Sequence, residues 1–240
     1  GKQISTLVGF AGKDNYGLEG LELSFNNTLA GKDGKQKFYR NAKQQIISQP
    51  IEVEESIKGR DLILTIDSNI QYYAYKYLAE AVIGSDAISG TAIVLDNKNG
   101  EVLAIASYPS FNPNDSSREI QKNRVFVDSY EPGSIIKPIL LSGAIDRKYL
   151  DAKSFISTPQ RISLDGNLIS DTNNYKQQLP IEIISNSSQV GAAKIALMLG
   201  QENIITQYRM FGLAKPISVN FPSSSIGYIN EREVLSNHEI

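Results

Sequence analysis

The chain has 240 residues, 41% of them hydrophobic, and a formal net charge of −2. This is enough for one large domain or two smaller ones with a proper core, and the interspersed charges argue against a nucleic-acid or polybasic membrane surface. The chain has no cysteine and one histidine, His238, which argues against disulfides, zinc sites and a Ser-His-Asp relay.

The first quarter of the chain, residues 1–60, is rich in glycine and charge and shows no long helical period. Within it, residues 17–34 predict a short helix closed by a glycine turn. Residues 35–55 predict two or three extended pieces, with Pro50 marking a break. We expect this part to form a small unit of short elements.

The signals become stronger from Asp61 onward. A short apolar run at 62–66 predicts a strand, and a helix over about 69–82 is predicted to be capped by Asp67 or Ser68. A hairpin of 91–95 and 102–106 follows, because Asn99-Gly100 supplies the positive φ that a tight turn requires.

The second half of the chain is mainly helical in pattern. Helices are predicted at about 134–147, 181–186, 190–199 and 202–211. A small hairpin of 161–164 and 168–170 is predicted around Asp165-Gly166. Because an isolated hairpin is marginal in water, this pattern indicates that sheet partners are missing from the chain.

A nucleophile and a base are predicted at the start of the 134–147 helix. Residues three apart share a helix face, so Ser134 and Lys137 should stand together. A serine hydroxyl needs a nearby base, and a lysine can be that base when burial lowers its pKa. Pro132 and Gly133 place Ser134 at a helix N-terminus, whose backbone N–H groups can hold an oxyanion. Pro138 predicts a departure from ideal helix that leaves the Ser134 carbonyl free.

A Ser-x-x-Lys tetrad also occurs by chance at the start of an ordinary capped helix. The surrounding sequence must therefore distinguish a catalytic motif from such a helix. The stretch Glu131-Pro-Gly-Ser-Ile-Ile-Lys-Pro138 resembles the first active-site motif of class B penicillin-binding proteins. Asn123-Arg124 and Asp128 stand upstream, as in that family, and the hairpin from Gly90 to Ser110 with Asn112-Pro-Asn114 resembles its opening strands. The family's lead-in helix is resembled by Thr65-Ile-Asp67, and its pedestal by Gly17-Leu-Glu-Gly-Leu-Glu22. The resemblance spans nearly the whole chain and is greatest to the cell-division member.

The resemblance also indicates a second motif, Ser-x-Asn, at Ser187-Ser188-Gln189. It implies that Ser187 relays a proton toward the leaving group and that Gln189 orients the substrate amide. Gln189 replaces the family's asparagine with a side chain that is one methylene longer. A groove that must place this amide within hydrogen-bond reach of a substrate carbonyl need not accommodate the extra length. Asn186 could supply the amide after a shift in register. A polar loop that only caps the helix from 190 remains the alternative.

The resemblance implies an α+β fold, with a pedestal over 1–60 and, over 61–240, the N-terminal part of a transpeptidase domain whose antiparallel sheet is covered by helices. It implies a serine-type peptidoglycan DD-transpeptidase for septal wall synthesis, with stem peptides ending in D-Ala-D-Ala as substrates and β-lactams as acylating agents. Division membrane proteins would be partners, and nucleic acid would not. The expected location is the periplasmic side of the bacterial inner membrane, with an anchor outside this chain.

The family's third motif, Lys-Thr-Gly or Lys-Ser-Gly, does not occur in the sequence. We therefore expect a piece of a longer protein that ends before this motif and that is inactive or nearly so by itself, because loss of one oxyanion donor alone costs about 10²–10³ in rate. Two alternatives stay open. One is a β-lactamase or carboxypeptidase of the same fold, and the other is a non-catalytic division scaffold. No metal or organic cofactor is implied by the resemblance or by either alternative.

Overall fold

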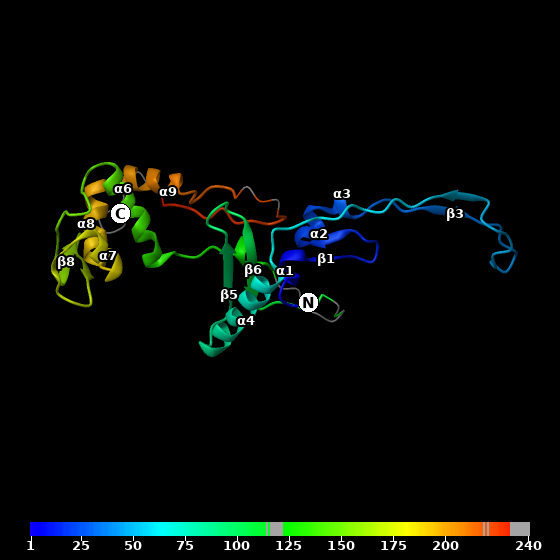
Figure 1. The fold of residues 1–240 in the computed structure, drawn as a ribbon, viewed down its shortest axis with the longest axis horizontal. Helices are drawn as coiled ribbons and strands as arrows, with labels where there is room; N and C mark the ends of the chain where they lie inside the picture. The colour runs from blue at the N-terminus through cyan, green and yellow to red at the C-terminus, as the bar shows by residue number, and fades with distance from the viewer. Residues whose placement is uncertain (114, 116–121, 218, 220, 231–240) are drawn as a thin grey trace. The chain divides into compact units, whose positions relative to one another are not determined.

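The computed structural model describes residues 1–113, 115, 122–217, 219 and 221–230, so Asn114 and His238 lie outside the described residues. The chain divides into two compact units. The first is Gly1–Asp128 with Ser218–Ser225, and the second is Ser129–Ile217 with Ile226–Ile240. Each unit combines helices with antiparallel strand pairs (Figure 1), which confirms the predicted α+β class.

The first unit opens with short elements. They are α1 (Ser5–Val8), β1 (Phe10–Ala11), β2 (Gly17–Glu19), α2 (Gly20–Ser24) and α3 (Asn26–Leu29). The segment predicted as one short helix thus begins as a strand, and its helical part is divided in two. The reason is pairing, because β2 forms an antiparallel pair with β1 before the chain turns into α2.

A two-stranded ribbon follows, formed by β3 (Lys35–Lys37) and β4 (Glu52–Glu54), and it confirms the predicted extended pieces. All six strand residues are exposed. The register sets lysines opposite glutamates, with Lys35 Nζ 3.9 Å from Glu54 Oε2 and Lys37 paired to Glu52. Exposed pairs of this kind add little stability, so they mainly favour this register.

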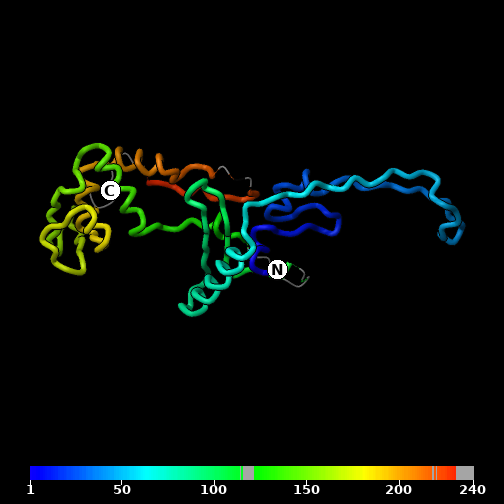
Figure 2. The backbone as a smooth tube through the Cα atoms, in the orientation of Figure 1, coloured from blue at the N-terminus to red at the C-terminus, as the bar shows by residue number. Residues whose placement is uncertain are grey.

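The helix α4 (Ser68–Gly84) lies beside the hairpin of β5 (Gly90–Leu95) and β6 (Val102–Tyr108), as Figures 1 and 2 show. Both elements confirm the prediction. The predicted cap is also present, since Asp67 Oδ1 accepts hydrogen bonds at 2.9 Å from the N–H groups of Asn69 and Ile70.

The strand predicted at 62–66 is wrong. These residues form no ladder and contact β6 only at separate points, with Thr65 Oγ1 2.6 Å from the Val102 carbonyl and the Asp67 N–H 2.9 Å from the Leu103 carbonyl. Of the apolar run, Ile66 packs against the core, while Ile63 is 93% exposed. The run is apolar, but it does not pair as a strand.

The core of the first unit joins β6, α5 (Arg124–Val127) and the N-terminal segment, and a buried side chain of α4 is hydrogen-bonded to two of them. Leu7, Ile105 and Phe126 form its buried centre. The Gln71 side chain, 2% exposed, exchanges two 2.8 Å hydrogen bonds with the backbone of Ile105 and donates a third, 2.6 Å long, to the Gln3 carbonyl. A buried amide satisfied in this way fixes how α4 meets β6.

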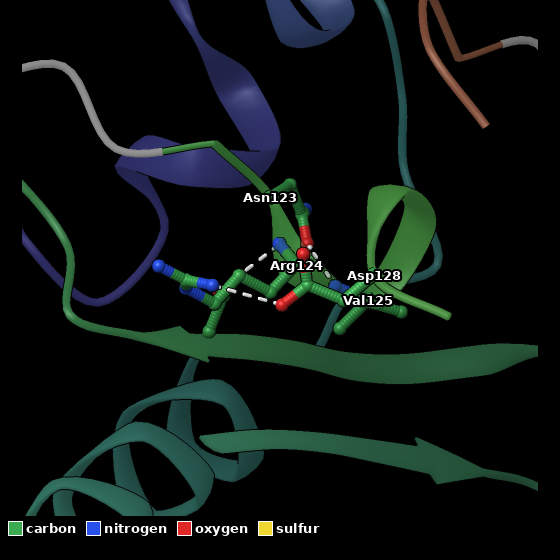
Figure 3. Close-up of polar contacts among 5 residues, drawn as sticks. Asn123, Arg124, Val125 and Asp128 are labelled. Carbon is green, nitrogen blue, oxygen red and sulfur yellow. Dashed lines mark hydrogen bonds and ion pairs between the residues drawn. The ribbon is translucent and has the colours of Figure 1, made fainter. Parts of the chain in front are cut away.

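The short helix α5 precedes the Ser134 motif in the chain, and Figure 3 shows the polar contacts of its residues. Asn123 Oδ1 caps it by accepting from the Val125 N–H at 3.2 Å, and Arg124 Nη1 lies 2.9 Å from Asp128 Oδ2. The residues upstream of the motif therefore have a local structural role as cap and ion pair.

The second unit alternates helices with two strand pairs. Its elements are η1, a 3-10 turn (Gly133–Ile136), α6 (Lys137–Asp146), β7 (Ile156–Thr158), β8 (Arg161–Leu164), β9 (Asn167–Ser170), β10 (Lys176–Gln178), α7 (Pro180–Ser185), α8 (Gln189–Leu199) and α9 (Gln201–Met210). The hairpin β8–β9 and the four helices confirm the prediction. The pair β7–β10 was not predicted, because its strands are short and 17 residues lie between Thr158 and Lys176.

The core of the second unit forms between α6 and α8. Each helix buries residues spaced i, i+1 and i+4, an apolar stripe of the α-helical period. The buried set is Leu140, Leu141, Ala144, Leu150, Ile156, Ile183, Ile195, Ala196, Leu199 and Ile204. Gly191 of α8 lets α7 approach closely, because a Cβ there would lie 2.7 Å from Ile183 Cγ1.

We predict that Gly191→Ala destabilises the protein. Ile183 is fully buried and β-branched, so it cannot yield easily, and overpacking of this kind costs about 1–3 kcal/mol against a gain in helix propensity of at most about 1 kcal/mol. Urea unfolding of the full-length protein should show a lower midpoint. Gly84→Ala is the matched control, because no described atom outside its own stretch of helix lies within 4 Å of the added Cβ. Equal midpoints for the two variants would contradict this packing.

Candidate active site

Ser134 and Lys137 lie one turn apart where η1 runs directly into α6. A 3-10 turn has three residues, so side chains at i and i+3 lie above one another on one face. Gly133 precedes Ser134 with φ of +61°, a left-handed conformation that glycine adopts without strain. Ser134 therefore lies on an exposed turn, on the same face as Lys137 and one turn before it.

The prediction drawn from Pro138 is half right. The first turn does depart from an ideal α-helix, since it is a 3-10 turn. The Ser134 carbonyl is not free, however, because it accepts the Lys137 N–H. Tightening the turn gives this carbonyl an i+3 partner in place of the i+4 N–H that proline lacks.

Ser187 links the two motif residues. It lies between α7 and α8, and its Oγ is 2.9 Å from Ser134 Oγ and 3.1 Å from Lys137 Nζ. Lys137 Nζ also donates to the Ser187 carbonyl at 2.7 Å. In the described structure the amine makes no direct hydrogen bond to Ser134 Oγ, so the connection runs from Ser134 through Ser187 to Lys137.

The Lys137 amine sits in an environment that favours its neutral form. The residue is only 9% exposed, and burial lowers the pKa of the amine below its ordinary value, while the Asp171 carboxylate opposes this by raising it. A neutral amine has two N–H bonds and a lone pair. It can therefore donate to the Ser187 carbonyl and still take a proton from the Ser187 hydroxyl, whose hydrogen rotates to suit its partners.

Ser187 has an uncommon backbone conformation. Its φ is +51°, in the left-handed region that residues with a Cβ rarely adopt. Such strain costs about 1–3 kcal/mol and persists only where surrounding contacts fix it. Here it lets one residue offer both its carbonyl and its hydroxyl to the same amine.

Gln189, the fourth predicted site residue, lies apart from this line of hydrogen bonds. It is the first residue of α8, it is exposed, and its backbone N–H donates to Asp171 Oδ1 at 2.6 Å. Its carboxamide makes no hydrogen bond to the described residues. Asn186 is the C-cap residue of α7 and is also exposed.

Two further residues shape the site. Ser188 is the N-cap of α8, and its Oγ accepts the Gly191 N–H at 2.8 Å, so the loop that caps the helix is present alongside Ser187. Asp171, 8% exposed, accepts a 2.5 Å hydrogen bond from Ser188 Oγ. The cap has a sequence signal in the serine before the apolar period, whereas Asp171, 17 residues away, has none.

The described ranges contain no group of three or more His, Cys, Asp or Glu side chains that could hold a metal ion. Within the same ranges, none of the helices has both the length and the hydropathy needed to cross a bilayer.

Two family models match the chain. The penicillin binding protein transpeptidase domain matches residues 90–239, and the penicillin-binding protein dimerisation domain matches residues 2–64. The chain belongs to the penicillin-binding protein transpeptidase family. This confirms the resemblance drawn from the Ser134 motif and its surroundings.

Named relatives agree with this membership. The chain is 34% identical over 235 residues to a probable peptidoglycan D,D-transpeptidase PbpC of Pseudomonas aeruginosa, covering 96% of the chain and 42% of the relative. It is 34% identical over 239 residues to the peptidoglycan D,D-transpeptidase FtsI of Escherichia coli, covering 98% and 39%. The chain thus spans about two fifths of the length of these curated relatives.

Solved structures of the family share the fold. Penicillin binding protein 3 of Mycobacterium tuberculosis matches with a TM-score of 0.83 and 26% identity, over 100% of this chain and 52% of that one. The same protein complexed with ampicillin matches with a TM-score of 0.82 and 26% identity, over 98% and 50%. The described architecture is therefore that of a penicillin-binding protein.

We predict that Ser187→Ala slows the reaction of Ser134 with a fluorescent penicillin in the full-length protein. Removing the hydroxyl breaks the connection to the amine, and loss of a positioned proton-transfer group costs about 10²–10⁴ in rate. Ser185→Ala is the matched control, since that exposed hydroxyl on α7 donates only to the Glu182 carbonyl. A Ser187→Ala rate equal to that of the control would exclude Ser187 from proton transfer.

Proposed function

We propose that the complete protein is a serine-type peptidoglycan D,D-transpeptidase of septal cell-wall synthesis. The observation that carries the proposal is the hydrogen-bonded line from Ser134 through Ser187 to the buried Lys137 amine. The family membership and the relatives named as D,D-transpeptidases support the reaction class, and those named FtsI support the septal role.

In the first half of the reaction, Ser134 Oγ attacks the carbonyl of the penultimate D-alanine of a stem peptide. The proton of Ser134 moves to Ser187 Oγ, and the proton of Ser187 moves to Lys137 Nζ. When the bond to the terminal D-alanine breaks, the leaving amino group takes the proton from Lys137 Nζ through Ser187. The product is an ester on Ser134, Ser187 and Lys137 have regained their original protonation, and the released D-alanine carries the proton that Ser134 gave up.

In the second half, an amine from a neighbouring stem attacks the ester carbonyl. Its proton passes into the line toward Lys137, and Ser134 leaves as the alkoxide and is reprotonated through Ser187. A new amide cross-link forms and the free hydroxyl returns. A β-lactam carbonyl would react with Ser134 by the first half alone, which accords with the ampicillin complex of the Mycobacterium tuberculosis relative.

Gln189 is proposed to orient the substrate amide. Its exposed position at the first turn of α8, two residues after Ser187, supports this role. A carboxamide can accept and donate at once, as a peptide group requires. The role is proposed on family resemblance and on this placement.

We further propose that residues 1–60 serve as a non-catalytic pedestal and that 61–240 belong to the transpeptidase domain. The dimerisation-domain match to 2–64 and the transpeptidase match to 90–239 support this division. A place on the periplasmic side of the bacterial inner membrane, among division membrane proteins, accords with a septal wall enzyme. The whole activity is assigned to the complete protein, since no Lys-Thr-Gly or Lys-Ser-Gly occurs in these 240 residues.

We predict that the full-length protein is labelled by a fluorescent penicillin and that Ser134→Ala abolishes the label. Among the described residues, only Ser134 joins Ser187 in the line of hydrogen bonds to Lys137. Ser163→Ala, which removes an exposed hydroxyl from β8, is the matched control and should label like the unaltered protein. The bound label should persist for many minutes.

Two other results would each exclude the transpeptidase. A full-length protein that takes no label at Ser134 would be a scaffold. Rapid turnover of a chromogenic cephalosporin would indicate a hydrolase of the same fold.

A further inference from the structure

The loop that carries Ser187 is held from its C-terminal side by one buried carboxylate. Asp171 Oδ1 accepts the N–H groups of Gln189 at 2.6 Å and Val190 at 3.1 Å, and Asp171 Oδ2 accepts the Ser188 hydroxyl at 2.5 Å. Ser188 Oγ in turn accepts the Gly191 N–H at 2.8 Å. The first three N–H groups of α8 are therefore satisfied by Asp171 and by the hydroxyl that it orients.

Asp171 is itself anchored to a rigid element. It directly follows β9, at the base of the β8–β9 hairpin where Arg161 pairs with Ser170. Its N–H donates to the Gln160 carbonyl at 2.9 Å, which extends the hairpin by one more bond, and the residue is only 8% exposed. The carboxylate is thus a fixed point against which the start of α8 is placed.

Ser187 is held from its N-terminal side by α7. The Ser187 N–H donates to the Ile184 carbonyl at 3.1 Å, and the Ser188 N–H donates to the Ile183 carbonyl at 2.9 Å. Between these bonds and those of Asp171, the Ser187 backbone has its left-handed φ of +51°. In this conformation its carbonyl and its Oγ both face the Lys137 amine.

We propose that Asp171 is a positioning residue for the reaction of Ser134, because its carboxylate fixes the 187–190 turn so that Ser187 bridges Ser134 and Lys137. The inference rests on the proposed function. In the described structure the Asp171 carboxylate makes no hydrogen bond to Ser134, and it acts through Ser188 and the first N–H groups of α8. Loosening this turn would leave each residue of the line present but out of place, and a displacement of about 1 Å can cost 10²-fold in rate.

The carboxylate also acts electrostatically on the Lys137 amine. This gives a second readout, which would not change if Asp171 only stabilised the fold. Burial lowers the pKa of the Lys137 amine, and the Asp171 charge raises it. Asp171→Asn removes the charge and keeps an Oδ1 that can accept from Gln189 and Val190, whereas its amide cannot accept the Ser188 hydroxyl. With the charge gone, the pKa of Lys137 falls further, so the acidic limb of the rate profile moves to lower pH.

The test uses the full-length protein and a fluorescent penicillin, with the acylation rate constant measured per active site from the final amount of label. Asp171→Ala should lower this rate constant about 10²-fold. Asp171→Asn should restore part of the loss and shift the acidic limb to lower pH. Asp165→Asn, at the tip of the same hairpin, is the matched control and should leave both the rate and the pH profile unchanged.

Thermal unfolding of each variant separates positioning from folding. Suppose that both Asp171 variants unfold at a lower temperature, but that their acylation rate constants per active site stay within about twofold of the unaltered protein at every pH. Asp171 would then be purely structural, and the inference would be overturned. If Asp171→Ala does not fold, the Asp171→Asn rate and pH shift decide alone. An unaltered protein that takes no label would instead refute the proposed function itself.

Discussion

The site depends on a lysine amine held out of water beside a serine. Lys137 is buried at the first turn of α6, and its amine donates to the carbonyl of Ser187 as well as lying within reach of its hydroxyl. Desolvation favours the neutral amine, which can take a proton, and the two contacts with Ser187 compensate for the lost water. The reactivity assigned to the exposed Ser134 follows from this one arrangement.

The second unit is built to keep this arrangement in place. Lys137 is carried by α6 and Ser187 by the turn between α7 and α8, and these helices share one hydrophobic core. The close approach at Gly191 and Ile183 sets how α7 meets α8, while Asp171 ties the start of α8 to a hairpin. Packing therefore places the elements, and polar contacts then fix the turn between them.

The sequence predicted what local rules decide, namely the caps, the Asn-Gly turn, the helical periods and the spacing of Ser134 and Lys137. It was wrong at 62–66, where apolar content indicated a strand but only isolated contacts reach β6. It could not show Asp171, whose partners are 17 to 19 residues away, nor that Ser187 would stand between Ser134 and Lys137. Such features arise from tertiary contacts that no local pattern encodes.

The most direct test of this account is the ionisation of the Lys137 amine itself. A ¹³C NMR titration of the full-length protein, with the Lys137 ε-carbon resonance assigned by its loss in Lys137→Arg, gives the pKa of this one group. Because desolvation is the main influence on this amine, we expect its pKa to lie below the ordinary 10.5. An amine that titrates at or above 10.5 would be a hydrated or ion-paired cation, and it could not serve as the base for Ser134.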